Sequence, residues 1–220
     1  MSATFRICRV IIEPVFRLFF PSKRLGYKEK PFDGPTVIVC NHISNWDSIL
    51  VATCFKKESY FLCKKEVFKN KVLGSFVRRL GGIKIDREKP EFNEIKTTLK
   101  LLKDRKRLVI FPEGTRNKSK NGDLLPIKGG AGMFAYKAKA RIIPMYINKP
   151  TRFLRRNFVF IGEPFTLDEF YGEKFTQELA EKINQKIKEQ ILFCKDKLNF
   201  YFVEKKQKKV LRKRRTKRKR

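Results

Sequence analysis

The 220-residue sequence has five cysteines, one histidine and no long apolar run, and each of these features argues against a kind of site or segment. Its five cysteines are odd in number and form no Cys-x-x-Cys pair, which favours buried free thiols in a reducing, cytosol-facing compartment. A structural disulfide or a zinc site is the alternative, although the single histidine, His42, argues against a histidine-rich metal site. No run of 18 or more uncharged apolar residues occurs, so a membrane-spanning helix is not expected.

Acidic residues are scarce as well: 22 Asp and Glu stand against 53 Lys and Arg, which gives a formal net charge of +31. Residues 205–220 hold 12 of the basic residues and no acidic one, and removing these charges still leaves +19 on the rest of the chain. Such a charge indicates an anionic partner: a phospholipid surface, a phosphorylated substrate or nucleic acid. Nucleic acid is disfavoured, because no aromatic residue interrupts the basic tail and no recognised binding module precedes it.

The nearest approach to a long apolar stretch, residues 5–20, carries its charged residues at helical spacing. These are Arg6, Arg9, Glu13 and Arg17. At about 100° per residue they fall within roughly 80° of arc, leaving the wide apolar face of a helix that lies in a bilayer interface. We therefore expect a membrane-contacting amphipathic helix, kinked or divided at Pro14, with a helix packed on the core as the alternative. Charges interrupt the apolar stretch and no small-residue cleavage site follows, so a secretory signal fits poorly.

A turn-rich stretch at residues 31–35 precedes a region in which short apolar runs alternate with helical patterns. Strands are predicted at residues 36–40, 60–63, 82–85, 108–111, 142–147 and 158–161, the last of which closes the sheet. Helices are predicted from about residue 47 and at residues 72–80, 91–103, 129–140 and 175–193. This order predicts an α/β fold with a mixed, largely parallel sheet flanked by helices. The chain then divides into an N-terminal membrane-association segment (1–32), one domain (33–203) and a polybasic tail (204–220).

The first group of chemically distinctive residues, Asn41-His42-Ile43-Ser44-Asn45-Trp46-Asp47, directly follows a predicted buried strand. On one helix His42 and Asp47 would lie about 140° apart, so they meet only if His42 is in the loop and Asp47 in the first helical turn. Ser44 is a good N-cap for that helix. An aspartate bonded to one imidazole nitrogen fixes the tautomer and strengthens the other nitrogen as a base. The alternative is a capping box, Ser44-x-x-Asp47, beside an ordinary loop histidine.

A second group, Phe111-Pro112-Glu113-Gly114-Thr115-Arg116-Asn117, also follows a strand. Gly114 allows a tight turn that presents N–H groups to an anion, and the planar guanidinium of Arg116 suits a phosphate. Glu113 is expected to hold the loop or to accept a hydrogen bond from a substrate hydroxyl. Taken alone, the group is equally consistent with a turn that carries a surface ion pair.

Two weaker groups could add anion contacts. Gly82-Ile83-Lys84-Ile85-Asp86-Arg87 is a strand with a charged end, where Arg87 could bind phosphate. Lys128-Gly129-Gly130-Ala131-Gly132 opens a helix but lacks both the P-loop and the Rossmann spacing. Taken alone, each group is better explained by a strand-end ion pair or a plain helix start than by an anion site.

Together these groups resemble one family. The order Asn-His-x-Ser-x-x-Asp, Gly-Gly-Ile-x-Ile-Asp-Arg, Phe-Pro-Glu-Gly-Thr-Arg and Ile-Ile-Pro-Met-Tyr is similar to that of glycerolipid acyltransferases of the 1-acylglycerol-3-phosphate acyltransferase type. The resemblance covers about residues 35–165 and implies the glycerolipid acyltransferase fold for the domain. The basic C-terminus is not part of the pattern.

The resemblance implies transfer of a fatty acyl group from acyl-CoA or acyl-carrier protein to the sn-2 hydroxyl of lysophosphatidic acid, giving phosphatidic acid. His42 would then be the general base and Asp47 its orienting partner, with no acyl-enzyme and no cofactor beyond the co-substrate. No Gly-x-Ser-x-Gly nucleophile elbow is present, which agrees with direct transfer. Loop amides near Asn41 or Gly114 are candidate donors to the developing oxyanion. The implied substrate-binding residues are Asn41, Ser44, Arg87, Glu113, Gly114, Thr115, Arg116 and Lys128.

Both lipid substrates carry acyl chains, so the enzyme is expected at a membrane, on the cytoplasmic face of the cell membrane. The helix at residues 5–20 and the basic tail would provide apolar insertion and attraction to anionic lipid. Two alternatives stay open on sequence alone. One is a related acyltransferase that uses another lysolipid or an amino-lipid acceptor, and the other is a non-catalytic protein that binds membrane or nucleic acid.

Overall fold

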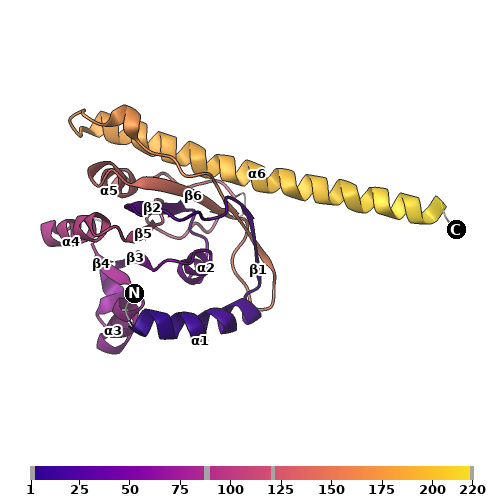
Figure 1. The fold of residues 1–220 in the computed structure, drawn as a ribbon, viewed down its shortest axis with the longest axis horizontal. Coiled ribbons are helices and arrows are strands. Elements are labelled where there is room, and N and C mark those ends of the chain that lie inside the picture. The colour runs from indigo at the N-terminus through magenta and orange to yellow at the C-terminus, as the bar shows by residue number, and fades with distance from the viewer. Residues whose placement is uncertain (1–2, 87–89, 120–121, 219–220) are drawn as a thin grey trace.

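The computed structural model describes residues 3–86, 90–119 and 122–218, and it has the predicted α/β architecture (Figure 1). The strands are β1 (Ser22–Gly26), β2 (Thr36–Cys40), β3 (Ser59–Lys64), β4 (Gly82–Ile85), β5 (Arg107–Ile110), β6 (Arg141–Ile147) and β7 (Asn157–Ile161). The helices are α1 (Ala3–Phe19), α2 (Asp47–Thr53), α3 (Lys71–Arg79), α4 (Phe92–Lys103), α5 (Gly130–Lys137) and α6 (Gln177–Arg218). Two 3₁₀ helices, η1 (Lys65–Phe68) and η2 (Asp168–Phe170), complete them.

The strands form one seven-stranded sheet in the order β1-β7-β6-β2-β5-β3-β4, confirming the largely parallel sheet. All neighbours are parallel except β6 and β7. The central strand β2, Thr-Val-Ile-Val-Cys, is buried along its whole length, as expected of a β-branched run in a parallel sheet covered on both faces. The sheet therefore holds the end of β2, and with it His42, at the middle of its carboxyl edge.

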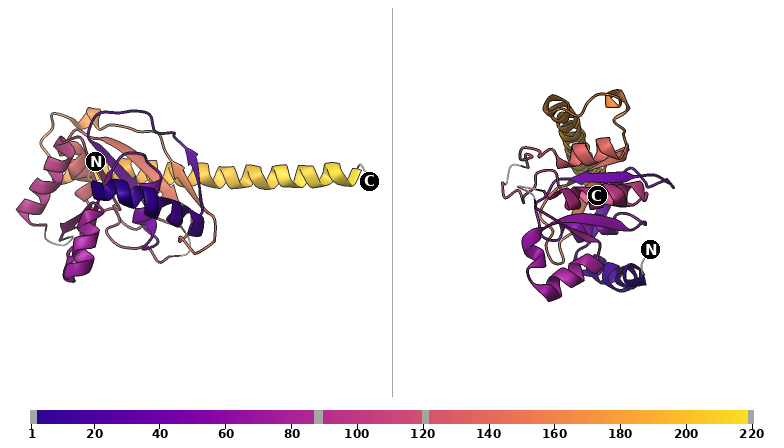
Figure 2. Two further views of the ribbon diagram at one scale, coloured as in Figure 1. Left: turned by 60° about the horizontal axis from the view of Figure 1, so that its bottom comes forward. Right: turned by 90° about the vertical axis from the view of Figure 1, so that its left-hand side faces the viewer.

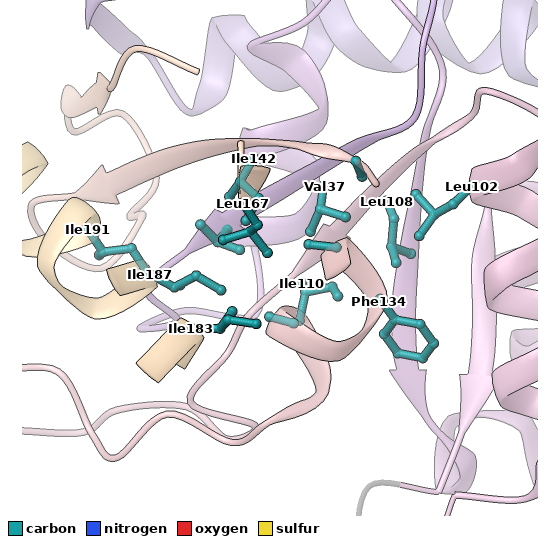
Figure 3. Close-up of a cluster of buried hydrophobic side chains, with 14 of the residues drawn as sticks. Val37, Leu102, Leu108, Ile110, Phe134, Ile142, Leu167, Ile183, Ile187 and Ile191 are labelled. Carbon is teal, nitrogen blue, oxygen red and sulfur yellow. The ribbon is translucent and has the colours of Figure 1, made fainter. Parts of the chain in front are cut away.

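Helices cover both faces of the sheet (Figures 1 and 2). Alternate residues of β2 point to opposite faces of the sheet. Val37 and Val39 pack with α4, α5 and α6 on one face, and Ile38 and Cys40 pack with α2 and Phe16 of α1 on the other. Isoleucines of α6 lie against strand residues in the first of these cores (Figure 3). The two cores fix the sheet from both sides, so the loops at its carboxyl edge are built on a rigid base.

The N-terminal helix forms as predicted, and α1 continues as one element through Pro14, so of the two predicted effects of this proline, a kink or a division, the division does not occur. Its Phe16 is buried in the core, whereas Val10 and Leu18 are well exposed. Within the described part of the chain, no helix is both long and apolar enough to cross a bilayer.

The sequence reading missed β1, which lies inside the 1–32 segment and pairs in parallel with β7. The prediction that residues 158–161 close the sheet is therefore wrong, because β1 is the outer strand on that side. Ser-Lys-Arg-Leu-Gly has no apolar alternation to signal a strand. Lysine and arginine are common on such edges, where they discourage pairing with further chains.

The last helix is much longer than predicted: α6 runs from Gln177 to Arg218, past the expected end at residue 193 and across the boundary proposed at 203/204. Side chains from Leu179 to Leu198 at intervals of three or four residues are buried against the sheet. Tyr201 and Phe202 still pack against the same core, and beyond them the helix extends away from the body (Figure 1). No glycine or proline follows Gly172, so no residue there stops the helix.

Candidate active site

Two loops meet at the carboxyl edge of the sheet. One joins β2 to α2 and carries His42 and Asp47, and the other follows β5 and carries residues 111–117. Because β2 and β5 are adjacent and parallel, their ends lie side by side. The structure thus brings together the first two groups of residues that the sequence singled out, at the edge where α/β proteins place their ligand sites.

His42 and Asp47 meet as the spacing predicted. The imidazole Nδ1 lies 3.0 Å from Asp47 Oδ2, and the same oxygen accepts the backbone N–H groups of Ile43 and Ser44, each at 2.7 Å. Asp47 is fully buried, whereas 13% of the His42 side chain is exposed. With Nδ1–H directed at the carboxylate, Nε2 is the nitrogen left to accept a proton.

The expected N-cap is wrong. The helix begins at Asp47, with Trp46 in the cap position and no side-chain cap bond. Ser44 Oγ instead accepts the N–H of Trp46 at 3.3 Å. The carboxylate of Asp47 takes the two backbone donors of the loop, so this carboxylate, rather than a serine hydroxyl, fixes the entry to α2.

The second loop fixes the backbone of His42 on both sides. The His42 N–H donates to Glu113 Oε1 at 2.8 Å, and its carbonyl accepts the N–H of Asn117 at 2.6 Å. The imidazole also stacks on Phe111, with ring centroids 4.2 Å apart and 19° between the planes. The histidine is therefore held by its main chain, its ring face and its Nδ1.

Glu113 is engaged by the protein at both oxygens. Its Oε2 accepts the Asn117 amide at 3.1 Å and the Leu125 N–H at 2.9 Å, and only 2% of the residue is exposed. These contacts favour a positioning role for Glu113 over the substrate contact implied by the resemblance. Asn117, absent from the predicted site, links the same parts. The sequence marked Asn117 only through its position directly after the Phe-Pro-Glu-Gly-Thr-Arg run.

The side chain of Asn41 is also bonded to the protein backbone. Its side-chain oxygen accepts the Ile147 N–H at 2.7 Å and its amide donates to the Ile147 carbonyl at 3.0 Å, so it extends the pairing of β2 with β6 by one residue. The residue is buried. Its contacts favour positioning of the His42 loop rather than substrate contact.

The remaining predicted residues within the described part of the chain lie in the second loop and in its continuation to α5. Gly114 adopts a left-handed backbone (φ 67°), and a Cβ there would lie 2.8 Å from Lys128 Cδ. Its N–H already donates to Phe111 O at 3.0 Å, so this amide is not free for an oxyanion. Thr115, Arg116 and Lys128 are exposed, with the Lys128 side chain lying against Gly114. Arg87 lies outside the described residues.

A cavity of about 200 Å³ lies beside Gly114 and Lys128. Apart from these two residues its lining is largely apolar and comes from β3, β4, β5, α4 and α5. The main lining side chains are Leu62, Ile85, Ile95, Ile110, Phe111, Met133 and Phe134. A chain of methylene groups is the kind of ligand that such a lining suits.

The thiol of Cys40, at the end of β2, lies close to the Asp47 carboxylate. Burial, and then the nearby Asp47 carboxylate, hold the pKa of this thiol well above its usual value. It therefore stays protonated at neutral pH and is a poor nucleophile. Cys40, Cys54 and Cys194 are buried and free, as the sequence predicted for them. In the described part of the chain no group of three or more His, Cys, Asp or Glu side chains is placed to hold a metal ion.

The chain is similar in sequence to known proteins. The family model described as Acyltransferase matches residues 23–148. The 1-acyl-sn-glycerol-3-phosphate acyltransferase of Bacillus subtilis is 31% identical over 195 residues, which cover 84% of this chain and 96% of that protein. The enzyme of the same name from Streptococcus pneumoniae is 36% identical over 116 residues, 52% of this chain and 42% of that protein.

The fold has a solved counterpart too. The crystal structure of the 1-acyl-sn-glycerophosphate (LPA) acyltransferase PlsC from Thermotoga maritima superposes with a TM-score of 0.58 at 21% identity, covering 89% of this chain and 84% of that one. At this identity the likeness concerns the fold alone. The sequence matches decide the family: more than half of this chain fits the family model, and nearly the whole Bacillus subtilis protein aligns with it. The chain belongs to the acyltransferase family.

Proposed function

We propose that this protein transfers a fatty acyl group from acyl-CoA or acyl-carrier protein to the sn-2 hydroxyl of lysophosphatidic acid, yielding phosphatidic acid. The observation that carries the proposal is the His42–Asp47 pair, 3.0 Å apart, with the His42 ring stacked on Phe111, a residue that also lines the apolar cavity. The names of the Bacillus subtilis and Streptococcus pneumoniae relatives support the choice of substrate.

In the proposed reaction, His42 Nε2 takes the proton of the acceptor hydroxyl while Asp47 stabilises the imidazolium that forms. The alkoxide oxygen attacks the thioester carbonyl, the C–S bond breaks, and the imidazolium returns its proton to the leaving thiolate. Because the thioester is already activated, no acyl-enzyme is needed, and the protonated Cys40 offers no competing nucleophile. The chain needs no cofactor beyond its acyl donor.

The second loop would bind the acceptor. Arg116 and Thr115 are exposed and directly precede Asn117, whose N–H donates to the His42 carbonyl, and the Lys128 side chain lies against Gly114, so these groups could meet the phosphate of lysophosphatidic acid. Arg87 is carried into this set by the resemblance alone. The apolar cavity would take part of an acyl chain.

We also propose that the protein works on the cytoplasmic face of the cell membrane. In this proposal α1 contacts the bilayer, residues 33–203 form the catalytic domain and the polybasic residues 204–220 add electrostatic attraction to anionic lipid. The exposed apolar residues of α1 support the first point, and the 12 basic charges of residues 205–220 support the last. The tail's share of vesicle binding would fall with rising salt concentration.

The test is acyl transfer by the purified protein to lysophosphatidic acid in vesicles, with palmitoyl-CoA as donor, beside His42→Ala. We expect phosphatidic acid from the wild type and a rate about 10²–10⁴ lower from His42→Ala, because a positioned base is lost. Asn45→Ala is the matched control, since Asn45 is exposed in the same loop. Retention of more than a tenth of the turnover by His42→Ala would refute the base assignment.

Failure with palmitoyl-CoA would first be followed by acyl-carrier protein as donor and then by other lysolipid and amino-lipid acceptors. If product forms only with another acceptor, the proposed acyl-transfer chemistry stands and that acceptor replaces lysophosphatidic acid as the substrate. Failure with every pair would overturn the proposed function.

A further inference from the structure

The connection between β6 and β7 presents two large apolar side chains outward. Arg152 and Arg155 form an antiparallel bridge that closes a two-residue turn, with Phe153 and Leu154 at its tip, 59% and 62% exposed. Leu154 has φ 54°, in the left-handed region that glycine and asparagine occupy more readily than a branched side chain. A leucine held exposed in this conformation is unfavourable on both counts, which points to a role beyond folding.

The tip is held in place from its base. Asn157 donates through its side-chain amide to Lys149 O at 2.9 Å and to Thr151 Oγ1 at 3.1 Å, and both Asn157 and Thr151 are buried. The N–H of Leu154 donates to Phe19 O at the end of α1, at 2.6 Å. The turn is thus fastened to the helix rather than folded onto the core, and Figures 1 and 2 show the connection reaching the end of α1.

Aromatic contacts continue from the turn to the active site. Phe153 stacks on Phe19 with centroids 5.3 Å apart, and Phe153 also meets Phe20 at 6.2 Å. Phe20 in turn lies 4.8 Å from the ring of Trp46, which is 43% exposed and directly precedes Asp47. One continuous patch, called the tip patch below, therefore consists of Phe19, Phe20, Trp46, Phe153 and Leu154.

The charges around the tip of the turn indicate which kind of partner it contacts. Arg152, Arg155 and Arg156 are exposed, and residues 148–156 contain no acidic residue. Two apolar side chains between arginines match the boundary of an anionic bilayer, where acyl chains meet phosphate groups. A second copy of this chain would bring like charges together, and nucleic acid offers no apolar layer for Phe153 and Leu154.

We infer that the β6–β7 turn inserts into an anionic phospholipid surface, and that the tip patch extends the membrane contact of α1 to the mouth of the active site. The inference rests on the proposed membrane function of α1. Its consequence is that Trp46, and with it the His42 loop, lies at the lipid boundary where a lysolipid acceptor would present its hydroxyl.

Trp46 is the single tryptophan of the chain and reports on this patch directly. We expect its fluorescence to shift to shorter wavelength on vesicles of phosphatidylcholine with phosphatidylglycerol. We expect Leu154→Gly and Phe153→Ala to weaken vesicle binding about five- to tenfold each, through the apolar area removed. Phe92→Ala is the matched control, because Phe92 is 78% exposed and its helix α4 packs on the other face of the sheet.

Leu154→Gly separates function from folding. Glycine relieves the left-handed backbone, so the thermal midpoint should stay equal or rise while vesicle binding falls, whereas a purely structural leucine would leave binding unchanged. Acyl transfer to a short-chain, monomeric lysophosphatidate should stay unchanged, since the turn carries no catalytic group.

The outcomes separate this inference from the proposed function. If Leu154→Gly and Phe153→Ala both bind vesicles as tightly as the wild type, the inference is overturned and the proposed membrane contact of α1 stays intact. Wild-type protein that binds anionic vesicles without a spectral shift would overturn the inference and leave the proposed membrane contact of α1 intact. Wild-type protein that does not bind anionic vesicles would overturn both, while acyl transfer to the monomeric substrate would still test the chemistry. A shift caused by an oligonucleotide and not by vesicles would assign the patch to nucleic acid instead.

Discussion

The two loops that meet at the active site are built in opposite ways. In the β2–α2 connection the side chains that form and hold the catalytic pair are shielded from solvent: Asn41 and Asp47 are buried, and 13% of the His42 side chain is exposed. The β5–α5 connection has side chains of both kinds. Glu113 is buried and holds the His42 backbone, whereas Arg116 is exposed to solvent. The first loop is therefore expected to set the rate of proton transfer, and the cations of the second to set the affinity for an anionic acceptor.

Asp47→Asn should produce the largest effect. The amide oxygen can still accept the N–H groups of Ile43 and Ser44, but it offers no negative charge to a protonated His42. We expect kcat to fall by about 10²–10⁴, with the KM for the acceptor within about threefold of the wild type. Steady-state kinetics together with thermal unfolding would check this, and Asn45→Ala is again the control. A kcat close to that of the wild type would remove Asp47 from the mechanism.

Glu113→Gln tests the fastening between the loops. Three donors, the N–H groups of His42 and Leu125 and the amide of Asn117, converge on this carboxylate. A glutamine turns one of the two oxygens into a donor, so at least one buried N–H loses its acceptor, at a cost of about 1–3 kcal/mol. We expect a lower free energy of unfolding in urea and a kcat reduced about ten- to fiftyfold, because the His42 backbone is no longer fixed.

The exposed Glu163 offers the matched change, since Glu163→Gln alters the same chemistry on the surface and should leave both quantities unchanged. A raised KM for the acceptor with an unchanged free energy of unfolding would contradict the positioning role. It would return Glu113 to the substrate contact that the resemblance implies.

The first loop was largely predictable from sequence, and so was the sheet around it. Apolar, largely β-branched runs predicted β2 at residues 36–40 and β4 at residues 82–85 with the bounds that the structure has. The spacing of His42 and Asp47 allowed one arrangement in which they meet, and the structure has it. β1 was not predictable, because its place depends on pairing with β7 and not on its own pattern.

The hydrogen bonds that hold the catalytic loop in place could not be predicted from local sequence patterns. Glu113 and His42 are 71 positions apart, and Asn41 and Ile147 are 106 apart, so neither partner is visible from the other's neighbourhood. Such bonds exist only because the parallel sheet aligns the ends of β2, β5 and β6. The family pattern marks Glu113 and Asn41 without saying that they bind other parts of the protein. The length of α6 was missed because, after Tyr201 and Phe202 pack against the core, residues 203–210 are mostly exposed and show no core pattern.

Arg116→Ala should give the smallest of the three effects and the clearest contrast with the first loop. The guanidinium is exposed, so its loss should leave the thermal midpoint and kcat almost unchanged, while the KM for lysophosphatidic acid rises about five- to tenfold. Arg116→Lys should recover part of this, because a lysine supplies the charge without the planar fork.

Lys118→Ala distinguishes a specific contact from the general field of the loop, because it removes the same charge from an exposed position two residues away. If Arg116 binds the phosphate directly, the KM of Lys118→Ala should stay within about twofold of the wild type, and its small change should vanish at high salt. Equal increases in KM for the two variants would mean that the second loop attracts the acceptor through its net charge alone. The site would then owe its selectivity to the fixed geometry of the first loop.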